Sequence, residues 1–394
     1  MMTLLLAAIT ALGPFSIDTY LPSFHDIALS LGASQIEVQQ TLTAYLLPFS
    51  IMMLWHGAIA DAIGRRRLLL VGLALYMLAA LACVLATRIE HLWLGRAAMG
   101  ISAGVGMVVG RAIIRDLYAG ADAQRLMAHV GTIFAIAPAI APIIGGWLQT
   151  GFGWRAIFIF LAAFAALLFV ACWRHLPETL PVTQRQSLHP VALARAYFQA
   201  LTDPAFVAAC AAVALHFAGV FIYVLAAPVF LVQHLGYSER EFAWLFIPLT
   251  SGMMLGSWLS GRLAGRITAD ATVRLGYLLM TIAALINLGI NIGAPLGAAW
   301  YVAGLPLYTC GMALANPSLT LYALDRAPNR RGLASSCQSF MHTATSALAA
   351  GVIVPLLWHT TLHMALGMLT LLTAGALGTL LYNRYAHHAL RPEL

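Results

Sequence analysis

Charged residues are scarce in this chain. Only 9% of its 394 residues are charged, lysine is absent, and all 21 basic residues are arginines. A soluble domain of ordinary composition carries about 25% charged residues. With 61% hydrophobic residues and a mean hydropathy of +0.85, the chain has too little polar surface to cover a soluble enzyme of this length. Disorder is excluded as well, because it requires low hydrophobicity and high net charge. The composition indicates a protein embedded in lipid.

Cysteine is also sparse, and its pattern is not that of a metal or redox site. The five cysteines form no CxxC pair, and most lie inside apolar runs, so we interpret them as small packing residues. The chain also lacks an HExxH motif, a DDxxD motif and paired carboxylates within the apolar runs. A membrane-embedded enzyme acting on lipids or isoprenoids is therefore a poor alternative. We expect no catalytic residues, no bound metal and no cofactor.

Long apolar runs dominate what is present. A helix that crosses the hydrocarbon core needs about 20 mostly apolar residues, and its backbone must be satisfied internally. The runs predict an all-α membrane protein with twelve transmembrane helices, near residues 2–24, 38–60, 68–87, 92–114, 126–150, 156–173, 204–231, 242–261, 275–293, 297–324, 332–358 and 362–382.

The arginines predict the orientation of these helices. If both termini are cytoplasmic, only Arg88, Arg155 and Arg240 fall in outer loops, and Arg96 and Arg111 lie inside the fourth run. The remaining 21 − 3 − 2 = 16 lie in inner loops and the tail, Arg125, Arg330 and Arg391 among them. This bias follows the positive-inside rule and explains the net charge of +7 without nucleic acid as a partner. The start of the chain lacks a basic n-region and a cleavage site, so we expect no removable signal peptide.

The longest polar stretch divides the chain. Residues 174–203 contain Pro177, Pro181 and Pro190 and are predicted to form a cytoplasmic linker. It would join a six-helix bundle over 1–173 to a second one over 204–394. Transporters built from repeated bundles place their site near the midplane. Aromatic, methionine and polar side chains suit an adaptable substrate pocket, for which the candidates are Phe15, Tyr45, Met52, His216, Tyr223, Phe246, Asn316 and Gln338.

A glycine-rich loop follows the second run and reads WHGAIADAIGRRRL from Trp55. Gly57 and Gly64 allow close packing and a tight turn, and Asp61 and Arg65 are four residues apart, close enough to pair. With Arg66, these residues resemble the signature loop of the major facilitator superfamily, GxxxD(R/K)xGR(R/K), although Ala62 replaces one basic position. The resemblance implies a latch for the cytoplasmic gate. The alternative is an ordinary positive-inside turn.

The fourth run carries an intramembrane charge and closely spaced glycines. Arg96 lies about one turn inside, and Gly100/Gly104 and Gly106/Gly110 are small-xxx-small pairs. The arginine resembles that of the RxxxG motif of the same superfamily, which implies a role in proton transfer. An arginine that extends to the outer interface is the alternative. At the inner end of this run lie the remaining members of the expected gate cluster, Arg111, Arg115 and Asp116, of which Asp116 is the expected partner of Arg65.

The fifth run contains two prolines and a glycine pair. Pro138 and Pro142 are followed by Gly145 and Gly146, a pattern that kinks a helix and permits close approach. It resembles the antiporter motif GxxxGPxxGG of the superfamily's exporters, with alanine at two glycine positions. An ordinary kinked helix is the alternative.

Asp18 is the only carboxylate well inside a run. An ionised carboxylate there costs a few kcal/mol, so it must be protonated, paired or open to water. Apolar surroundings favour the neutral acid, so the carboxylate can take up a proton near neutral pH and release it when a polar or cationic substrate or water arrives. We therefore expect Asp18, with Arg96, to couple protons to transport. The alternative is an aspartate that caps the outer end of its helix.

The phrases PFSIDTYLPSF, VGRAIIRDLY and APAIAPIIGGWL resemble the Bcr/CflA drug-resistance group of the major facilitator superfamily. The resemblance implies the major facilitator fold and a proton-coupled drug antiporter of the bacterial inner membrane, working by alternating access. Its partners would be small drug-like molecules, protons and the bilayer, its driving force the proton gradient, and we expect a monomer. A proton-coupled importer and a metabolite exporter are the alternatives on the same scaffold.

Overall fold

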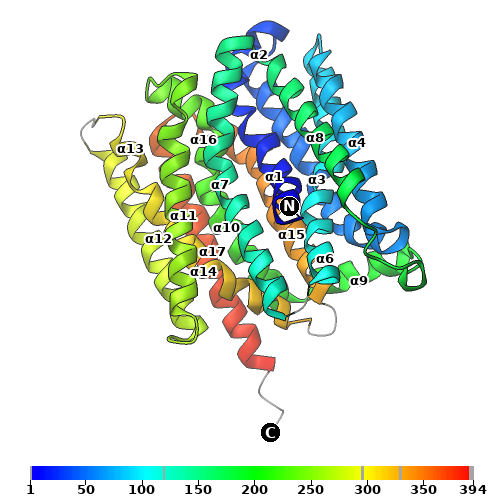
Figure 1. Cartoon of the computed structure of the whole chain (residues 1–394). Helices are drawn as coiled ribbons and strands as arrows, with labels where there is room; N and C mark the ends of the chain where they lie inside the picture. The colour runs from blue at the N-terminus through cyan, green and yellow to red at the C-terminus, as the bar shows by residue number, and fades with distance from the viewer. Residues whose placement is uncertain (1, 119, 294–296, 328–330, 390–394) are drawn as a thin grey trace. The chain divides into compact units, whose positions relative to one another are not determined.

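The computed structural model describes residues 2–118, 120–293, 297–327 and 331–389, without the side chains at 120, 121, 123–125, 128, 129, 132 and 386–389. Arg330, Arg391 and the side chain of Arg125, three of the arginines predicted on the inner side, lie outside this description. Within the described residues the regular structure is helical, apart from one isolated bridge between Ala264 and Ile267. The predicted all-α class is confirmed (Figure 1).

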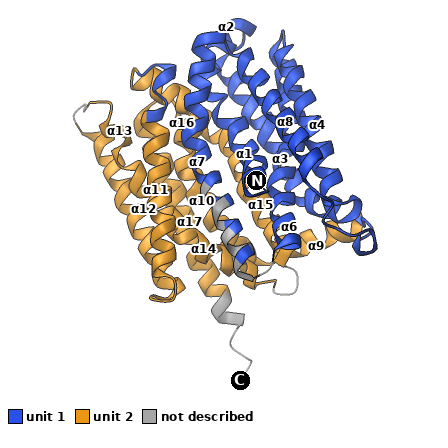
Figure 2. Cartoon of the chain, viewed as in Figure 1, with its two compact units in different colours: residues 1–189, 237–243 blue, residues 190–236, 244–394 orange. Residues whose placement is uncertain are grey.

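The chain forms two compact units, shown in two colours in Figure 2. Unit 1 comprises residues 1–189 and 237–243. Its helices, of which η1, η2 and η4 are short 3-10 helices, are α1 Met2–Asp18, η1 Leu21–Ser23, α2 Phe24–Leu31, α3 Gln35–Ile63, α4 Arg65–Val84, α5 Ile89–Ala103, α6 Val105–Leu117, α7 Gly120–Phe152, α8 Arg155–His175, η2 Val182–Gln184 and η4 Glu239–Glu241.

Unit 2 comprises residues 190–236 and 244–394. Its helices are α9 Pro190–Thr202, α10 Pro204–Leu225, η3 Pro228–His234, α11 Ala243–Leu263, α12 Ala269–Ile292, α13 Trp300–Ala303, α14 Leu305–Asp325, α15 Arg331–Leu348, η6 Ala349–Ile353, α16 Val354–Leu357 and α17 Thr361–Ala389.

Eleven helical segments of the described residues are long and apolar enough to span a membrane. They coincide with eleven of the twelve predicted spans. The predicted span 297–324 coincides with α14, which is 21 residues long but is not one of the eleven, because polar residues such as Asn316 lower its mean hydropathy. Many large apolar side chains of these helices are exposed, for example Leu78, which is 58% exposed, and Trp258, which is 52% exposed. Such surfaces suit a lipid environment.

The linker is more ordered than its sequence predicts. Within the predicted 174–203, residues Pro190–Thr202 form the helix α9, which packs against α10 and α15 in unit 2. The three prolines led us to predict an irregular linker, although one of them stands at the first position of the helix, where proline is well tolerated. Residues 176–189 belong to unit 1 instead. The division into bundles at 173 and 204 remains a prediction.

Local signals explain several helix boundaries. Ser34 and Glu37 form a capping box at the start of α3, where the Ser34 amide donates to the Glu37 carboxylate over 2.7 Å. Asp203 caps α10, whose first residue is Pro204. Gly64 has φ +102° and makes the turn between α3 and α4, a conformation that favours glycine.

Small residues set the distances between helices in unit 1. A Cβ atom added at Gly100 would collide with the backbone oxygen of Tyr45 on α3, and one at Gly106 would collide with that of Ile9 on α1. The close packing predicted for the fourth run is therefore confirmed at these positions, although Gly104 divides the run into α5 and α6. The five cysteines are all buried and free, as expected for packing residues.

Candidate functional site

Asp18 is the last residue of α1 and is buried, with 4% of its surface exposed. The chain that follows forms the three-residue turn η1, so the acid stands where α1 ends in unit 1. No described residue forms an ion pair with it. A carboxyl group in this position is most easily accommodated in its neutral form. Asp18 therefore stands at a helix end, as the alternative of a capping aspartate expects, and is buried there, so its coupling role remains a prediction.

Arg96 lies on α5 and is completely buried. Its guanidinium carbon lies 4.4 Å from the ring centre of Tyr45 and 4.7 Å from that of Tyr20, both favourable cation–π distances. Its Nη1 donates to the backbone oxygen of Ser16 over 2.8 Å. The side chain therefore points into unit 1, contrary to the alternative of an arginine that extends to the interface. Its Nε and Nη2 have no hydrogen-bond partner in the described part of the chain.

Three tyrosines and a serine surround this arginine, and only Tyr45 was a sequence candidate. The Ser16 hydroxyl is hydrogen-bonded to Tyr76 on α4 and donates to the Leu12 carbonyl. Tyr20 is hydrogen-bonded to Thr41 over 2.9 Å. Ser16, whose backbone oxygen accepts from Arg96, lies two residues before Asp18 in α1. The spacing of residues 16, 20 and 76 in the sequence gives no signal for this arrangement.

The glycine pair of the expected antiporter motif packs against the backbone next to Asp18. A Cβ atom added at Gly145 on α7 would collide with the backbone oxygen of Thr19, the residue after Asp18. Gly146 is equally close to the backbone of Glu239 in the segment 237–243, which belongs to unit 1. Helix α7 continues through Pro138 and Pro142 without interruption. The glycine pair therefore permits contacts on two sides of α7.

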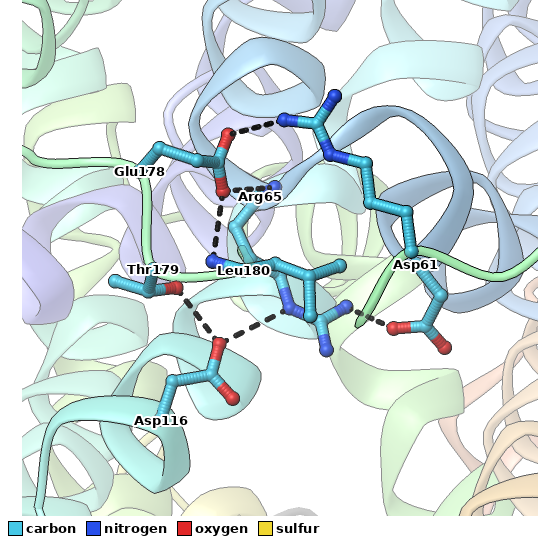
Figure 3. A network of polar contacts seen from close by, with 7 residues as sticks. Asp61, Arg65, Asp116, Glu178, Thr179 and Leu180 are labelled. Carbon is cyan, nitrogen blue, oxygen red and sulfur yellow. Dashed lines mark hydrogen bonds and ion pairs between the residues drawn. The ribbon is translucent and has the colours of Figure 1, made fainter. Parts of the chain in front are cut away.

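The signature loop forms a network of polar contacts centred on Arg65 (Figure 3). Arg65 forms an ion pair with Asp61, four residues earlier, and its Nε lies 3.3 Å from Oδ2 of Asp116 at the end of α6. Both pairings expected from the sequence are present. The Arg65 side chain is only 12% exposed, so these contacts are less screened than those of a surface pair.

The linker contributes two residues that the sequence did not indicate. The Glu178 carboxylate accepts from the backbone N–H of Arg65 over 2.9 Å and from that of Leu180 over 3.1 Å. Thr179 donates to Oδ2 of Asp116 over 2.8 Å. Figure 3 shows both contacts as dashed lines from these linker residues. The segment after α8 therefore contacts both the backbone of Arg65 and its partner Asp116.

The other predicted gate residues have different surroundings. Arg66 donates from Nη2 to the Trp173 carbonyl over 2.7 Å. Arg111 and Arg115 are exposed and form no ion pair within the described residues. A Cβ atom added at Gly57 would meet only Val108, at an ordinary 3.8 Å. The tight packing expected at Gly57 is therefore not found, and Gly64 is the glycine that the loop geometry requires.

The pocket candidates of unit 1 differ in burial. Phe15 packs against Phe164 of α8, with ring centres 5.6 Å apart. Tyr45 is fully buried against Arg96 and Phe49. Met52 is half-buried. Their role as pocket residues remains a prediction.

The candidates of unit 2 include two polar pairs. His216 contacts Asn316 over 2.8 Å, and Gln338 donates to Thr320 over 3.1 Å. Tyr223 accepts from Asn287 over 2.5 Å and is buried, as is Phe246. Asn316 and Gln338 keep part of their surface exposed. No group of three or more potential metal-binding side chains occurs among the described residues.

Comparisons with known proteins agree with this architecture. Residues 4–350 match the model of the Major Facilitator Superfamily. An uncharacterized MFS-type transporter, YdgK of Bacillus subtilis, is 33% identical over 84% of this chain and 83% of its own length. A bicyclomycin resistance protein homolog of Haemophilus influenzae is 26% identical over 93% of this chain and 92% of its own. Multidrug resistance protein D of Escherichia coli is 30% identical over 66% and 65%, respectively.

The fold has a counterpart among solved structures. A D-xylose-proton symporter superposes with a TM-score of 0.74 over 96% of both chains, at 14% sequence identity. At that identity the likeness concerns the fold alone. The family model and the relatives confirm the resemblance drawn from the signature loop and the Bcr/CflA-like phrases, and they identify a multi-pass membrane transporter and not an enzyme. The chain belongs to the major facilitator superfamily.

Proposed function

We propose that this protein exports small drug-like molecules in exchange for protons, by alternating access, in the cytoplasmic membrane of a bacterium with both termini inside. The names of two relatives, a bicyclomycin resistance protein homolog and a multidrug resistance protein, support the substrate class. The arginine bias of the predicted inner loops supports the orientation. No cofactor is needed, because the proton gradient supplies the driving force, and we propose that the monomer is the working unit.

The observation that carries the proposal is the burial of Asp18 without an ion pair among the described residues. Insertion scales give a cost of about 2.5–3.5 kcal/mol for an ionised aspartate at the centre of a membrane helix. Asp18 lies where α1 ends, within the apolar segment Met2–Leu31, and is buried there. Asp18 is therefore neutral while it is enclosed and loses its proton when a cavity admits water or a cationic substrate. One carboxyl group that alternates between these environments can exchange a proton for a substrate.

Arg96 provides the counter-charge for that exchange. Two of its guanidinium nitrogens are buried without hydrogen-bond partners in the described part of the chain, although buried polar groups are nearly always paired. Their N–H groups can donate to an ionised carboxylate or to a negatively polarised group of the substrate. In the proposed cycle, Arg96 stabilises the ionised form of Asp18, which favours release of the proton, and the tyrosines hold the guanidinium in place.

The Arg65 network is the proposed cytoplasmic latch. It joins the end of α3, the start of α4, the end of α6 and the linker through Asp61, Arg65, Asp116 and Glu178. Alternating access requires such a cluster to form in one state and to break in another. The network therefore controls the rate of the conformational change, whereas the residues around Asp18 control its coupling to protons.

Drug susceptibility provides the test. The protein is expressed in an efflux-deficient bacterium, and growth inhibition by chloramphenicol, bicyclomycin and ethidium is measured with and without a protonophore. The proposal predicts several-fold resistance to at least one compound, which the protonophore removes. Everted vesicles then give the direction of flux, because an importer on the same scaffold would move the compound the other way. Sensitivity unchanged across the panel would contradict drug export and favour a metabolite exporter.

A further inference from the structure

A second buried titratable group lies in unit 2, where the proposed function uses none. His216 on α10 is completely buried, and both of its ring nitrogens have polar neighbours. Nε2 donates to Oδ1 of Asn316 on α14 over 2.8 Å, and Nδ1 lies 3.5 Å from the hydroxyl of Tyr277 on α12. Since Nε2 carries the proton in the neutral ring, Nδ1 is the acceptor for Tyr277.

The chain of contacts continues to a further helix. Thr379 on α17 donates to the Tyr277 hydroxyl over 3.0 Å and also lies 3.3 Å from the Gly375 carbonyl. Tyr308 on α14 donates to the backbone oxygen of His216 over 2.8 Å. One imidazole therefore connects α10, α12, α14 and α17, the helices that form most of the packing of unit 2.

This chain can take up one proton without leaving a group unpaired. A proton added at Nδ1 of His216 gives an N–H that donates to the Tyr277 oxygen. The Tyr277 hydroxyl then donates to Thr379, and the Thr379 hydroxyl turns to the Gly375 carbonyl, which is already within reach. The Nε2–H bond to Asn316 is unchanged. The proton comes from water, no covalent bond other than N–H forms, and the direction of two hydrogen bonds reverses.

A second buried histidine lacks this arrangement. His56 on α3 is 1% exposed, and its Nε2 donates to the Ile101 carbonyl over 3.0 Å. Its Nδ1 has no hydrogen-bond partner in the described part of the chain. Protonation of His56 would therefore bury an unpaired N–H group, which costs free energy. Burial alone is similar for the two histidines, so the difference between them is the acceptor at Nδ1.

The polar and titratable groups near His216 can be named for each helix around α10. Tyr277 faces it from α12, Tyr308 from α14, and on α15 the ring of His342 stacks on Phe217, with centres 4.3 Å apart. Helix α17 contributes Thr379 and Gly375, and α9 and η6 contribute no hydrogen bond or ion pair to His216 in the described residues. No carboxylate and no arginine is among these neighbours, and His342 is the other basic side chain near His216.

A polar strip leads from this group along α14 and α15. Thr320 lies four residues after Asn316 and accepts from Gln338, which lies four residues before His342, so each pair shares one helix face. Further along the same two helices, Arg331 and Asp325 form an ion pair with a separation of 3.4 Å. The strip gives His216 a polar connection to the end of unit 2 at which α14 ends and α15 begins.

We propose that His216 is a second proton-binding site, with Tyr277 and Asn316 as the acceptors of its two N–H groups and the α14–α15 strip as its polar connection. The site is a property of unit 2 and does not require Asp18. Its use in transport rests on the proposed function.

The test is a titration of the full chain in lipid nanodiscs with 15N-labelled histidine, followed by NMR of the ring nitrogens from pH 8.5 to pH 4. Loss of a signal in His216→Gln and in His56→Gln assigns the two rings. Tyr277→Phe, which leaves the histidine in place, assigns His216 through its changed Nδ1 signal should His216→Gln fail to insert. We expect His216 to become imidazolium at a higher pH than His56, and Asn316→Leu to lower the protonated fraction of His216 at each pH.

Two results would overturn the proposal. One is a His216 ring that stays neutral down to pH 4, and the other is a His56 ring that protonates together with it or before it. A transport measurement then separates this site from the proposed function. If one proton is exchanged for each ethidium, a monovalent cation, no net charge crosses the membrane and the rate does not depend on the membrane potential. If two protons are exchanged, one net charge crosses and the rate responds to the potential.

The wild type should respond to a potassium–valinomycin potential, and His216→Gln should lose that response. Tyr277→Phe, at a residue outside the pocket candidates, should weaken the response to the potential while it keeps the response to a pH gradient. Absence of any proton-driven ethidium flux in the wild type would contradict the proposed function, and the titration would still decide the proton site. An unchanged response to the potential in a folded His216→Gln variant would exclude the site from coupling.

Discussion

Gly145 lies against the backbone oxygen of Thr19, with no room for a side chain between α7 and the end of α1. The next residue toward the N-terminus is Asp18. The glycine pair of the antiporter-like motif therefore determines how closely α7 approaches the buried acid. A movement of α7 during transport would change the surroundings of Asp18 directly.

Replacement of Gly145 by alanine should impair both stability and export. The added methyl group must displace backbone, and such overpacking costs about 1–3 kcal/mol. Gly131→Ala on the same helix is the matched control, because nothing lies within 4 Å of its Cβ position. Thermal unfolding in detergent and ethidium export should decline for Gly145→Ala only. Equal behaviour of the two variants would contradict the close contact.

Arg96→Lys should abolish proton-driven export although it preserves the charge. A lysine ammonium has no planar group to lie between two aromatic rings and cannot reproduce the donors of the guanidinium. The contacts to Tyr20, Tyr45 and the Ser16 carbonyl would be lost together. Arg88→Lys, at an exposed position, is the control. Export by Arg96→Lys at the wild-type rate would show that the positive charge alone suffices.

Glu178→Gln should loosen the turn at the start of α4. The Glu178 carboxylate accepts from the Arg65 amide, and hydrogen bonds to a charged group contribute about 1.5–3 kcal/mol. Hydrogen–deuterium exchange of the peptide that contains Arg65 should become faster, and Thr179→Val should act in the same direction. Glu90→Gln removes an exposed ion pair with Arg88 instead and serves as the control.

Substrate binding separates the latch from the pocket. If the Arg65 network is only a latch, Asp61→Asn and Glu178→Gln change the rate of export and leave the dissociation constant of bound ethidium within about twofold. A large loss of affinity in either variant would contradict this assignment.

Gly64→Ala should be the most damaging of the small changes in the signature loop. The backbone at Gly64 has φ +102°, and a Cβ atom would also collide with the Glu178 carboxylate. Strain of this kind costs about 1–3 kcal/mol. Gly57→Ala, by contrast, meets only an ordinary contact with Val108, so its unfolding temperature should remain close to that of the wild type.

The sequence was sufficient wherever one helix or one short loop determines a contact. The four-residue spacing predicted the Asp61–Arg65 pair, and the apolar runs predicted the helices. The resemblance to the family also predicted the Arg65–Asp116 pair, which joins two helix ends 51 positions apart. The sequence failed for the other contacts between distant residues. Arg65 and Glu178 are separated by 113 positions, and the residues that enclose Arg96 come from α1, α3, α4 and the short connection between α1 and η1. No local pattern encodes such contacts.

Two errors have identifiable causes. Helix α9 was missed because three prolines in the linker outweighed the helix-compatible residues that follow Pro190. Gly57 was expected to be packed tightly because it matches the signature loop, yet the nearest side chain, Val108, is at van der Waals distance. A motif match therefore does not establish that each of its glycines is sterically required.

The most direct test of the account concerns Asp18. Wild type, Asp18→Asn and Asp26→Asn are reconstituted into proteoliposomes, and ethidium export driven by an imposed pH gradient is measured together with the accompanying proton flux. Asp26 is the matched control, because it is a half-buried aspartate of the next helix that is hydrogen-bonded to Gln149. The account predicts that Asp18→Asn folds and binds ethidium. It should neither export ethidium against its concentration gradient nor move protons, whereas Asp26→Asn should export ethidium and move protons. Proton-driven export by Asp18→Asn at the wild-type rate would contradict it.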